Sequence, residues 1–134
     1  MKKFIIGLFS SSFIFCLSIT PAKADEDLLR LAISLCDFAK TDDRSQMRRK
    51  LKAAGMRLRA IYPAIQCGSD GSLLRVATLN NAFDAAKFLV SKAGVDSLTT
   101  PGADGKTLIQ FTEELIAGGD ASKQQFLDLY KSKL

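Results

Sequence analysis

The sequence contains no histidine and no tryptophan, and only three cysteines and three prolines among its 134 residues. Without histidine, the chain lacks the side chain that most often acts as a general acid or base near neutral pH and that most often binds a metal. The two cysteines beyond residue 24 would supply only half of a tetrahedral zinc site. The composition therefore argues against a zinc site and against a histidine-dependent reaction.

Other catalytic signatures are also missing. Ser72 has no histidine partner and is better explained as a helix cap. The run 68–71 is a turn without the lysine of a phosphate-binding loop. Glu113 and Glu114 are adjacent, so on a helix they point about 100° apart. We expect a non-enzymatic protein that needs no metal and no cofactor.

Residues 1–24 have the pattern of a secretory signal peptide. Lys2 and Lys3 precede an apolar run over residues 4–19, and the Ala-Lys-Ala sequence at residues 22–24 offers a cleavage site. The apolar run is short for a membrane span, which favours cleavage after Ala24 over an uncleaved anchor. We therefore expect a periplasmic protein in which residues 25–134 form a single helical domain and a monomer.

The charge balance changes when the predicted signal peptide is removed. The full chain carries 19 basic and 14 acidic residues. Three lysines leave with the signal peptide, so sixteen basic and fourteen acidic residues remain, with a net charge of +2. This small charge, the compartment and the lack of aromatic residues among the basic ones argue against nucleic acid as a partner.

Cys36 and Cys67 are the cysteines of the predicted mature chain. In an oxidising compartment, two cysteines in a small domain favour a disulfide over a metal site or a nucleophile. A bridge over this separation would stabilise the fold by roughly 3–4 kcal/mol through the loop that it closes.

Apolar residues at helical spacing predict helices along the whole mature chain. The predicted segments are Glu26–Lys40, Arg44–Ala54 with Met47, Leu51 and Ala54 inward, a helical hairpin within Asp70–Gly94, Thr107–Ala117 and a last helix begun by Asp120. Asp43 with Gln46, and Asn81 with Asp84, have the spacing of helix N-caps. Residues 56–65 leave a helix open against a shorter or extended structure, because Pro63 lies among helically spaced apolar residues. Residues 95–103 are predicted as a loop.

A repeated pattern links the central hairpin to the C-terminal part. Asp104-Gly105-Lys106-Thr107-Leu108 recurs 34 positions after Asp70-Gly71, and each copy is followed by an apolar helix, a polar turn and a second helix. This pattern, with the run AAKFLVSKAGVD, resembles a degenerate ankyrin repeat over about residues 70–130. The resemblance implies a binding scaffold of stacked helical hairpins; the alternative is a generic helical-hairpin domain.

A second resemblance covers about residues 35–90. The runs LCDFAKTDDRSQMRRKLK, RLRAIYPAIQC and SLLRVA are similar to a family of small secreted proteobacterial proteins that carries only a domain-of-unknown-function label. This resemblance implies the Cys36–Cys67 pairing and the secretory compartment, and no activity.

The most unusual feature of the sequence is a run of basic residues without an acidic one. It consists of Arg44, Arg48, Arg49, Lys50, Lys52, Arg57 and Arg59. Arg44, Arg48 and Lys52 are spaced to line one stripe, which we expect opposite the Met47/Leu51 face. The run is either a solvated helix face or an anion-binding face, because guanidinium groups pair with phosphate and carboxylate.

Together, these patterns predict an all-α protein of stacked, degenerate ankyrin-like hairpins with one disulfide. The expected function is interaction with a protein of the cell envelope, in envelope maintenance. The alternative is binding of lipid headgroups or of lipopolysaccharide phosphates through Arg44, Arg48, Arg49, Lys52, Arg57 and Arg59.

Overall fold

The structure is a computed structural model that describes residues 22–134. The predicted signal peptide lies outside this range except for residues 22–24, whose backbone begins the first helix. The described residues form α-helices and short 3-10 helices, with no β-strand. None of these helices is both long enough and apolar enough to span a lipid bilayer.

Eight α-helices follow one another along the described chain. They are α1 (Ala22–Thr41), α2 (Arg44–Ala54), α3 (Leu58–Ile61), α4 (Leu73–Leu79), α5 (Phe83–Ala93), α6 (Asp96–Thr99), α7 (Leu108–Ala117) and α8 (Gln124–Ser132). Single 3-10 turns occur at η1 (Tyr62–Ala64), η2 (Gly68–Asp70) and η3 (Ala121–Lys123).

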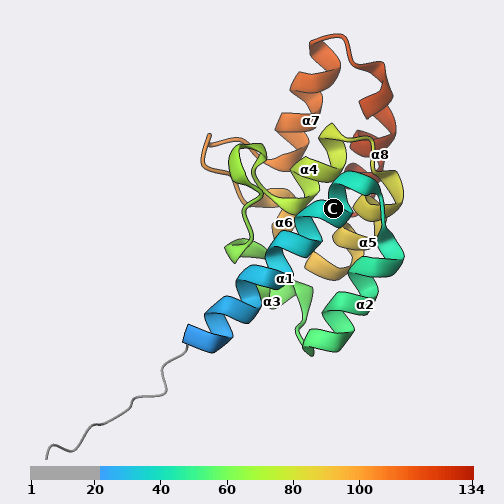
Figure 1. The fold of residues 1–134 in the computed structure, drawn as a ribbon. Helices are drawn as coiled ribbons and strands as arrows, with labels where there is room; N and C mark the ends of the chain where they lie inside the picture. The colour runs from blue at the N-terminus through green and yellow to red at the C-terminus, as the bar shows by residue number, and fades with distance from the viewer. Residues whose placement is uncertain (1–21) are drawn as a thin grey trace, which may run out of the picture.

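The longer helices pair into three hairpins, α1–α2, α4–α5 and α7–α8, which stack side by side (Figure 1). The first helix of the middle hairpin, α4, packs between α1 and α7. Its second helix, α5, packs between α2 and α8. The first helices therefore form one row and the second helices form another. The all-α prediction and the stacking of helical hairpins are confirmed.

The three hairpins share one turn geometry. A residue of positive φ stands at the turn of each: Asp42 (59°), Asn81 (55°) and Gly119 (105°). In each turn, the N–H of the next residue donates to the carbonyl five residues earlier. These bonds run from Asp43 to Phe38 (3.0 Å), from Ala82 to Ala77 (2.8 Å) and from Asp120 to Leu115 (3.1 Å).

Local hydrogen bonds at the helix starts confirm the predicted Asp43 and Ser72 caps, and Asp120 caps η3, which leads directly into α8. The side chains of Asp43 and Ser72 accept from backbone N–H groups three residues on. The predicted Asn81 cap is wrong, because Ala82 occupies the N-cap of α5 and Asn81 forms the turn before it. Asp42 of the preceding hairpin replaces the missing cap: its Oδ1 accepts from the N–H of Ala85 at 2.8 Å.

The structure decides the open stretch, residues 56–65, and differs from the sequence prediction at residues 95–103 and at Ala54. Residues 56–65 form α3 and η1, so the helix is interrupted before Pro63. Residues 95–103 are not wholly a loop, because α6 forms one helical turn that buries Leu98. Met47 and Leu51 face the core as predicted, but Ala54 is exposed.

The core runs continuously through all three hairpins. Leu35, Met47, Leu74 and Leu89 are buried within it. Polar groups inside it are paired: Thr78 of α4 and Tyr130 of α8 lie 2.6 Å apart through their hydroxyl oxygens. The third hairpin is thus held to the second by a buried hydrogen bond as well as by apolar contact.

The predicted disulfide is confirmed. Cys36 of α1 is bonded to Cys67, and their Cα atoms are 5.7 Å apart. Cys67 lies directly before η2, so the bridge fastens the segment between α3 and α4 to the first helix of the stack.

Candidate functional site

The loop groove is a hollow of about 520 Å³ between the segment that precedes α4 and the segment that precedes α7. We call residues 66–71 its first wall and residues 96–106 its second wall. The lining residues include Tyr62, Pro63, Gln66, Ser69, Thr100 and Pro101, with Arg59 and Arg75.

The two walls are equivalent parts of the repeat. In each, a backbone N–H donates to the carbonyl four residues on: Cys67 to Gly71 (2.7 Å) and Gly102 to Lys106 (2.9 Å). The next residue is an N-cap, Ser72 before α4 and Thr107 before α7. The equivalent caps are 35 positions apart, whereas the Asp-Gly pairs in the sequence are 34 apart. The second wall therefore contains one residue more after its Asp-Gly pair.

Arg75 connects α4 to the second wall. Its guanidinium donates to both carboxylate oxygens of Asp104 and to the Lys106 carbonyl, each at 2.8 Å. The same group lies over the Phe111 ring, 4.6 Å from the ring centroid. The hydrogen bonds from Arg75 hold the pKa of Asp104 far below its ordinary value. This bidentate geometry fixes the second wall relative to α4.

Two glycines allow Arg75 to pass between the walls. A Cβ atom on Gly102 would lie 2.8 Å from Nη2 of Arg75, and one on Gly71 would lie 3.1 Å from its Cδ. Both distances are shorter than ordinary van der Waals contact, so a larger residue at either position would displace the arginine. Arg75 therefore forms the base of the groove and touches both walls.

Tyr62 forms an apolar part of the floor. Its ring is buried, and its hydroxyl accepts from the Leu74 N–H at 3.4 Å. Burial raises the pKa of the Tyr62 phenol. The exposed Pro63 and Pro101 and several serine and threonine hydroxyls surround this floor. Such a mixture of apolar contact area and hydrogen-bonding groups suits the binding of a polypeptide segment.

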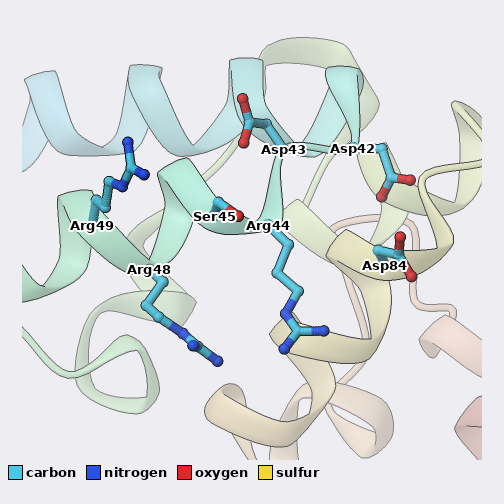
Figure 2. Close-up of a pocket in the computed structure, with 7 residues that line it drawn as sticks. All are labelled: Asp42, Asp43, Arg44, Ser45, Arg48, Arg49 and Asp84. Atoms are coloured by element: carbon cyan, nitrogen blue, oxygen red, sulfur yellow. The ribbon is translucent and has the colours of Figure 1, made fainter.

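A second hollow, also of about 520 Å³, lies between α2 and the start of α5. We call it the arginine hollow; it is lined by Asp42, Asp43, Arg44, Ser45, Arg48, Arg49 and Asp84. Figure 2 shows Arg44 and Arg48 extending in the same direction, with Arg49 directed away from them. Arg44 and Arg48 line this hollow together with Asp84 at the start of α5, so both face the α5 side of α2.

The six predicted anion-binding residues do not all line one hollow. Arg44, Arg48 and Arg49 line the arginine hollow, and Arg59 lines the loop groove beside Gly94. Lys52 and Arg57 line neither hollow. Within residues 22–134, no cation between positions 44 and 59 takes part in an ion pair. However, three aspartates stand among the three arginines of the hollow, so its lining is neutral overall.

Sequence reasoning missed Arg75 and Asp104 as a pair. They are 29 positions apart, and no spacing rule links an arginine within one helix to an aspartate in a later loop. One clue was available: Arg75 lies in the first turn of α4, three residues after the Ser72 cap, and Gly68 and Gly71 precede that cap.

Among the described residues, no group of three or more histidine, cysteine or acidic side chains is placed to hold a metal ion.

Comparison with known proteins gives one match, to a family. No curated protein and no solved structure matches the chain. Residues 35–100, which contain the disulfide, the middle hairpin and the first wall of the loop groove, match the family described as Protein of unknown function (DUF3718).

Proposed function

We propose that this chain is a non-enzymatic interaction module of the periplasm that binds a protein of the cell envelope through the loop groove. The observation that carries the proposal is the meeting of two equivalent walls in one groove, with Arg75 between them. A groove built in this way presents a preformed surface, which lowers the entropic cost of binding.

The repeated architecture supports the ankyrin-like part of the proposal. The three hairpins have the same turn geometry. Both helices of the middle hairpin pack on their counterparts in the two neighbouring hairpins. Stacked repeats of this kind offer extended binding surfaces made by successive loops. The disulfide supports an oxidising compartment, in agreement with the predicted signal peptide.

A tryptophan in the groove tests the proposal. Thr100 is exposed and lines the groove, whereas its exposed neighbour Thr99 does not. We would immobilise mature wild-type protein, Thr100→Trp and Thr99→Trp, and capture partners from an envelope extract at low and high salt. Loss of a specific protein partner with Thr100→Trp alone is the expected result. Equal capture by all three proteins would place binding elsewhere and overturn the proposal.

Anion binding by the basic residues is the second candidate, favoured by their lack of ion pairs. It would use lipid headgroups or lipopolysaccharide phosphates, and its affinity would fall steeply with salt. The triple change Arg48→Glu, Arg49→Glu and Lys52→Glu alters only exposed side chains. Loss of binding to vesicles containing anionic lipid would support this candidate. Unchanged binding, or none by the wild type, would exclude it.

A further inference from the structure

We propose that the Cys36–Cys67 disulfide positions the first wall of the loop groove, and that its reduction by a dithiol releases this wall and weakens binding in the groove. The inference rests on the proposed function, because it concerns regulation of the same groove. It differs from a general stabilising role for the disulfide, since it assigns the bridge to one wall.

The first wall has no hydrogen bond to the rest of the described structure. Its two backbone hydrogen bonds, from Cys67 to Gly71 and from Asp70 to Cys67, are internal. No side chain from position 66 to 71 forms a hydrogen bond or an ion pair within residues 22–134. The disulfide is therefore the one bond that ties this segment to another element of the described chain.

Both ends of the first wall are anchored, so its release would be local. Ile65 before it and Leu73 after it are buried in the core. Between them, Gly68 and Gly71 have φ values of 63° and 87°. Glycine has more backbone freedom than any other residue, so a segment flanked in this way gains many conformations once its tether is cut.

The second wall is held by different chemistry. Asp104 and the Lys106 carbonyl are bound by Arg75, and no cysteine lies in this wall. A dithiol would therefore release one side of the groove and leave the other side and its base in place. The groove would change from a preformed site to a half-ordered one, and the partner would bear the entropic cost of ordering the first wall.

The exchange reaction begins most directly at Cys67, which is half-buried, because Cys36 is buried. A thiolate of the dithiol attacks Sγ of Cys67, the Sγ–Sγ bond breaks, and Cys36 leaves as a thiolate that takes up a proton. The second thiol of the reductant then attacks the reductant's own sulfur in the mixed disulfide. Cys67 leaves as a thiolate and is protonated. The protein gains two electrons and two protons, and the dithiol becomes a disulfide.

Backbone dynamics of the mature protein test the inference without any partner. We would compare amide chemical shifts and heteronuclear NOE values of the oxidised protein, the protein in dithiothreitol and the Cys36→Ser/Cys67→Ser variant. We expect large shifts and reduced NOE values for Cys67 to Gly71 in the last two samples. The amides of Gly102, Gly105 and α5 should keep theirs. The double variant controls for side reactions, since dithiothreitol should leave its spectrum unchanged.

Two spectroscopic outcomes would overturn the inference. If the NOE values of the first wall do not fall, the wall holds itself. If signal dispersion is lost along the whole chain, the disulfide maintains the entire fold and not the wall.

Capture of the envelope partner then separates this inference from the proposed function. Oxidised protein should retain the partner that Thr100→Trp loses, and reduced protein should bind it at least roughly tenfold more weakly. A released wall with unchanged capture would overturn the control of binding by reduction, whereas capture by Thr100→Trp tests the binding role of the groove. A wall that stays in place would overturn only the redox inference, and Thr100→Trp would still decide the function.

Discussion

Arg75 and Asp104 form a bidentate ion pair that joins the start of α4 to the loop before α7, with both N–O distances at 2.8 Å. The arginine side chain is mostly enclosed, whereas Asp104 remains partly exposed. Fork-to-fork pairing of this kind restricts the relative orientation of its partners more than a single contact does. The pair therefore fixes the position of one hairpin's loop relative to the helix of another.

Asp104→Asn should reveal the acid dependence of this pair. The pKa of Asp104 is lowered in the folded protein, so the ionised carboxylate contributes stability above the unfolded pKa of about 3.9. That contribution is lost as the pH falls toward the folded pKa. Urea unfolding should therefore show a wild-type advantage that is full above about pH 5 and shrinks toward pH 2.

Asp37→Asn is a suitable control, since Asp37 is exposed on α1 and its carboxylate accepts no hydrogen bond within the described chain. A stability difference between wild type and Asp104→Asn that is the same at every pH would contradict the ion-pair explanation.

Asp42 should contribute through both its carboxylate and its backbone. Asp42→Asn keeps an oxygen that can accept from Ala85 and should be nearly neutral. Asp42→Gly keeps the positive φ but removes the cap, at a cost of about 1 kcal/mol in the free energy of unfolding. Asp42→Ala adds the strain of positive φ, roughly another 1 kcal/mol. Chemical denaturation of the four proteins checks this order, and a glycine variant as stable as the wild type would refute the capping role.

Lys123 should be needed for the docking of the third hairpin. Its buried Nζ donates to Asn81 Oδ1 at 2.7 Å and to the Leu79 carbonyl at 3.4 Å. Lys123→Met would remove this donor from both acceptors and would also break the ion pair of Lys123 with Asp120, so we expect a loss of roughly 1–3 kcal/mol in the free energy of unfolding. Lys133→Met, at an exposed position, is the matched control. Equal stability of both variants in urea would show that the buried ammonium is dispensable.

Loss of the disulfide should lower the stability without changing the fold. Cys36 and Cys67 are separated by 31 positions, and opening a loop of this length increases the entropy of the unfolded chain by an amount equal to about 3–4 kcal/mol. Urea unfolding of Cys36→Ser/Cys67→Ser should give this difference from the oxidised wild type. The far-ultraviolet circular dichroism of the two proteins should agree in the absence of urea. A variant as stable as the oxidised protein would contradict the loop-closure argument.

The accuracy of the sequence predictions follows the range of the interactions involved. The Asp43 and Ser72 caps were predictable, because donor and acceptor lie three residues apart in one chain segment. The disulfide was predictable from the expected oxidising compartment and the number of cysteines, and the structure gives its geometry.

Contacts between hairpins were beyond the reach of the sequence. Asp42 caps α5 from 43 positions away, and local rules assigned that role to Asn81. The sequence treats the basic run as continuous, yet α2 and α3 are separate helices: Arg44, Arg48 and Arg49 line one hollow and Arg59 lines the other. Both outcomes depend on how helices distant in the sequence are placed relative to one another. No pattern of neighbouring residues in the sequence encodes that placement.

The turn residues give the stack a direction. The side chain of Asp42 reaches the second hairpin, and that of Asn81 reaches Ser122 and Lys123 of the third. The equivalent residue of the third turn is Gly119, which has no side chain to offer. A protein engineer who wished to lengthen this stack would therefore exchange Gly119 for asparagine, and graft a copy of the second hairpin behind it. In each of the first two turns a side-chain oxygen accepts a hydrogen bond from the hairpin that follows, so these contacts run in one direction along the stack.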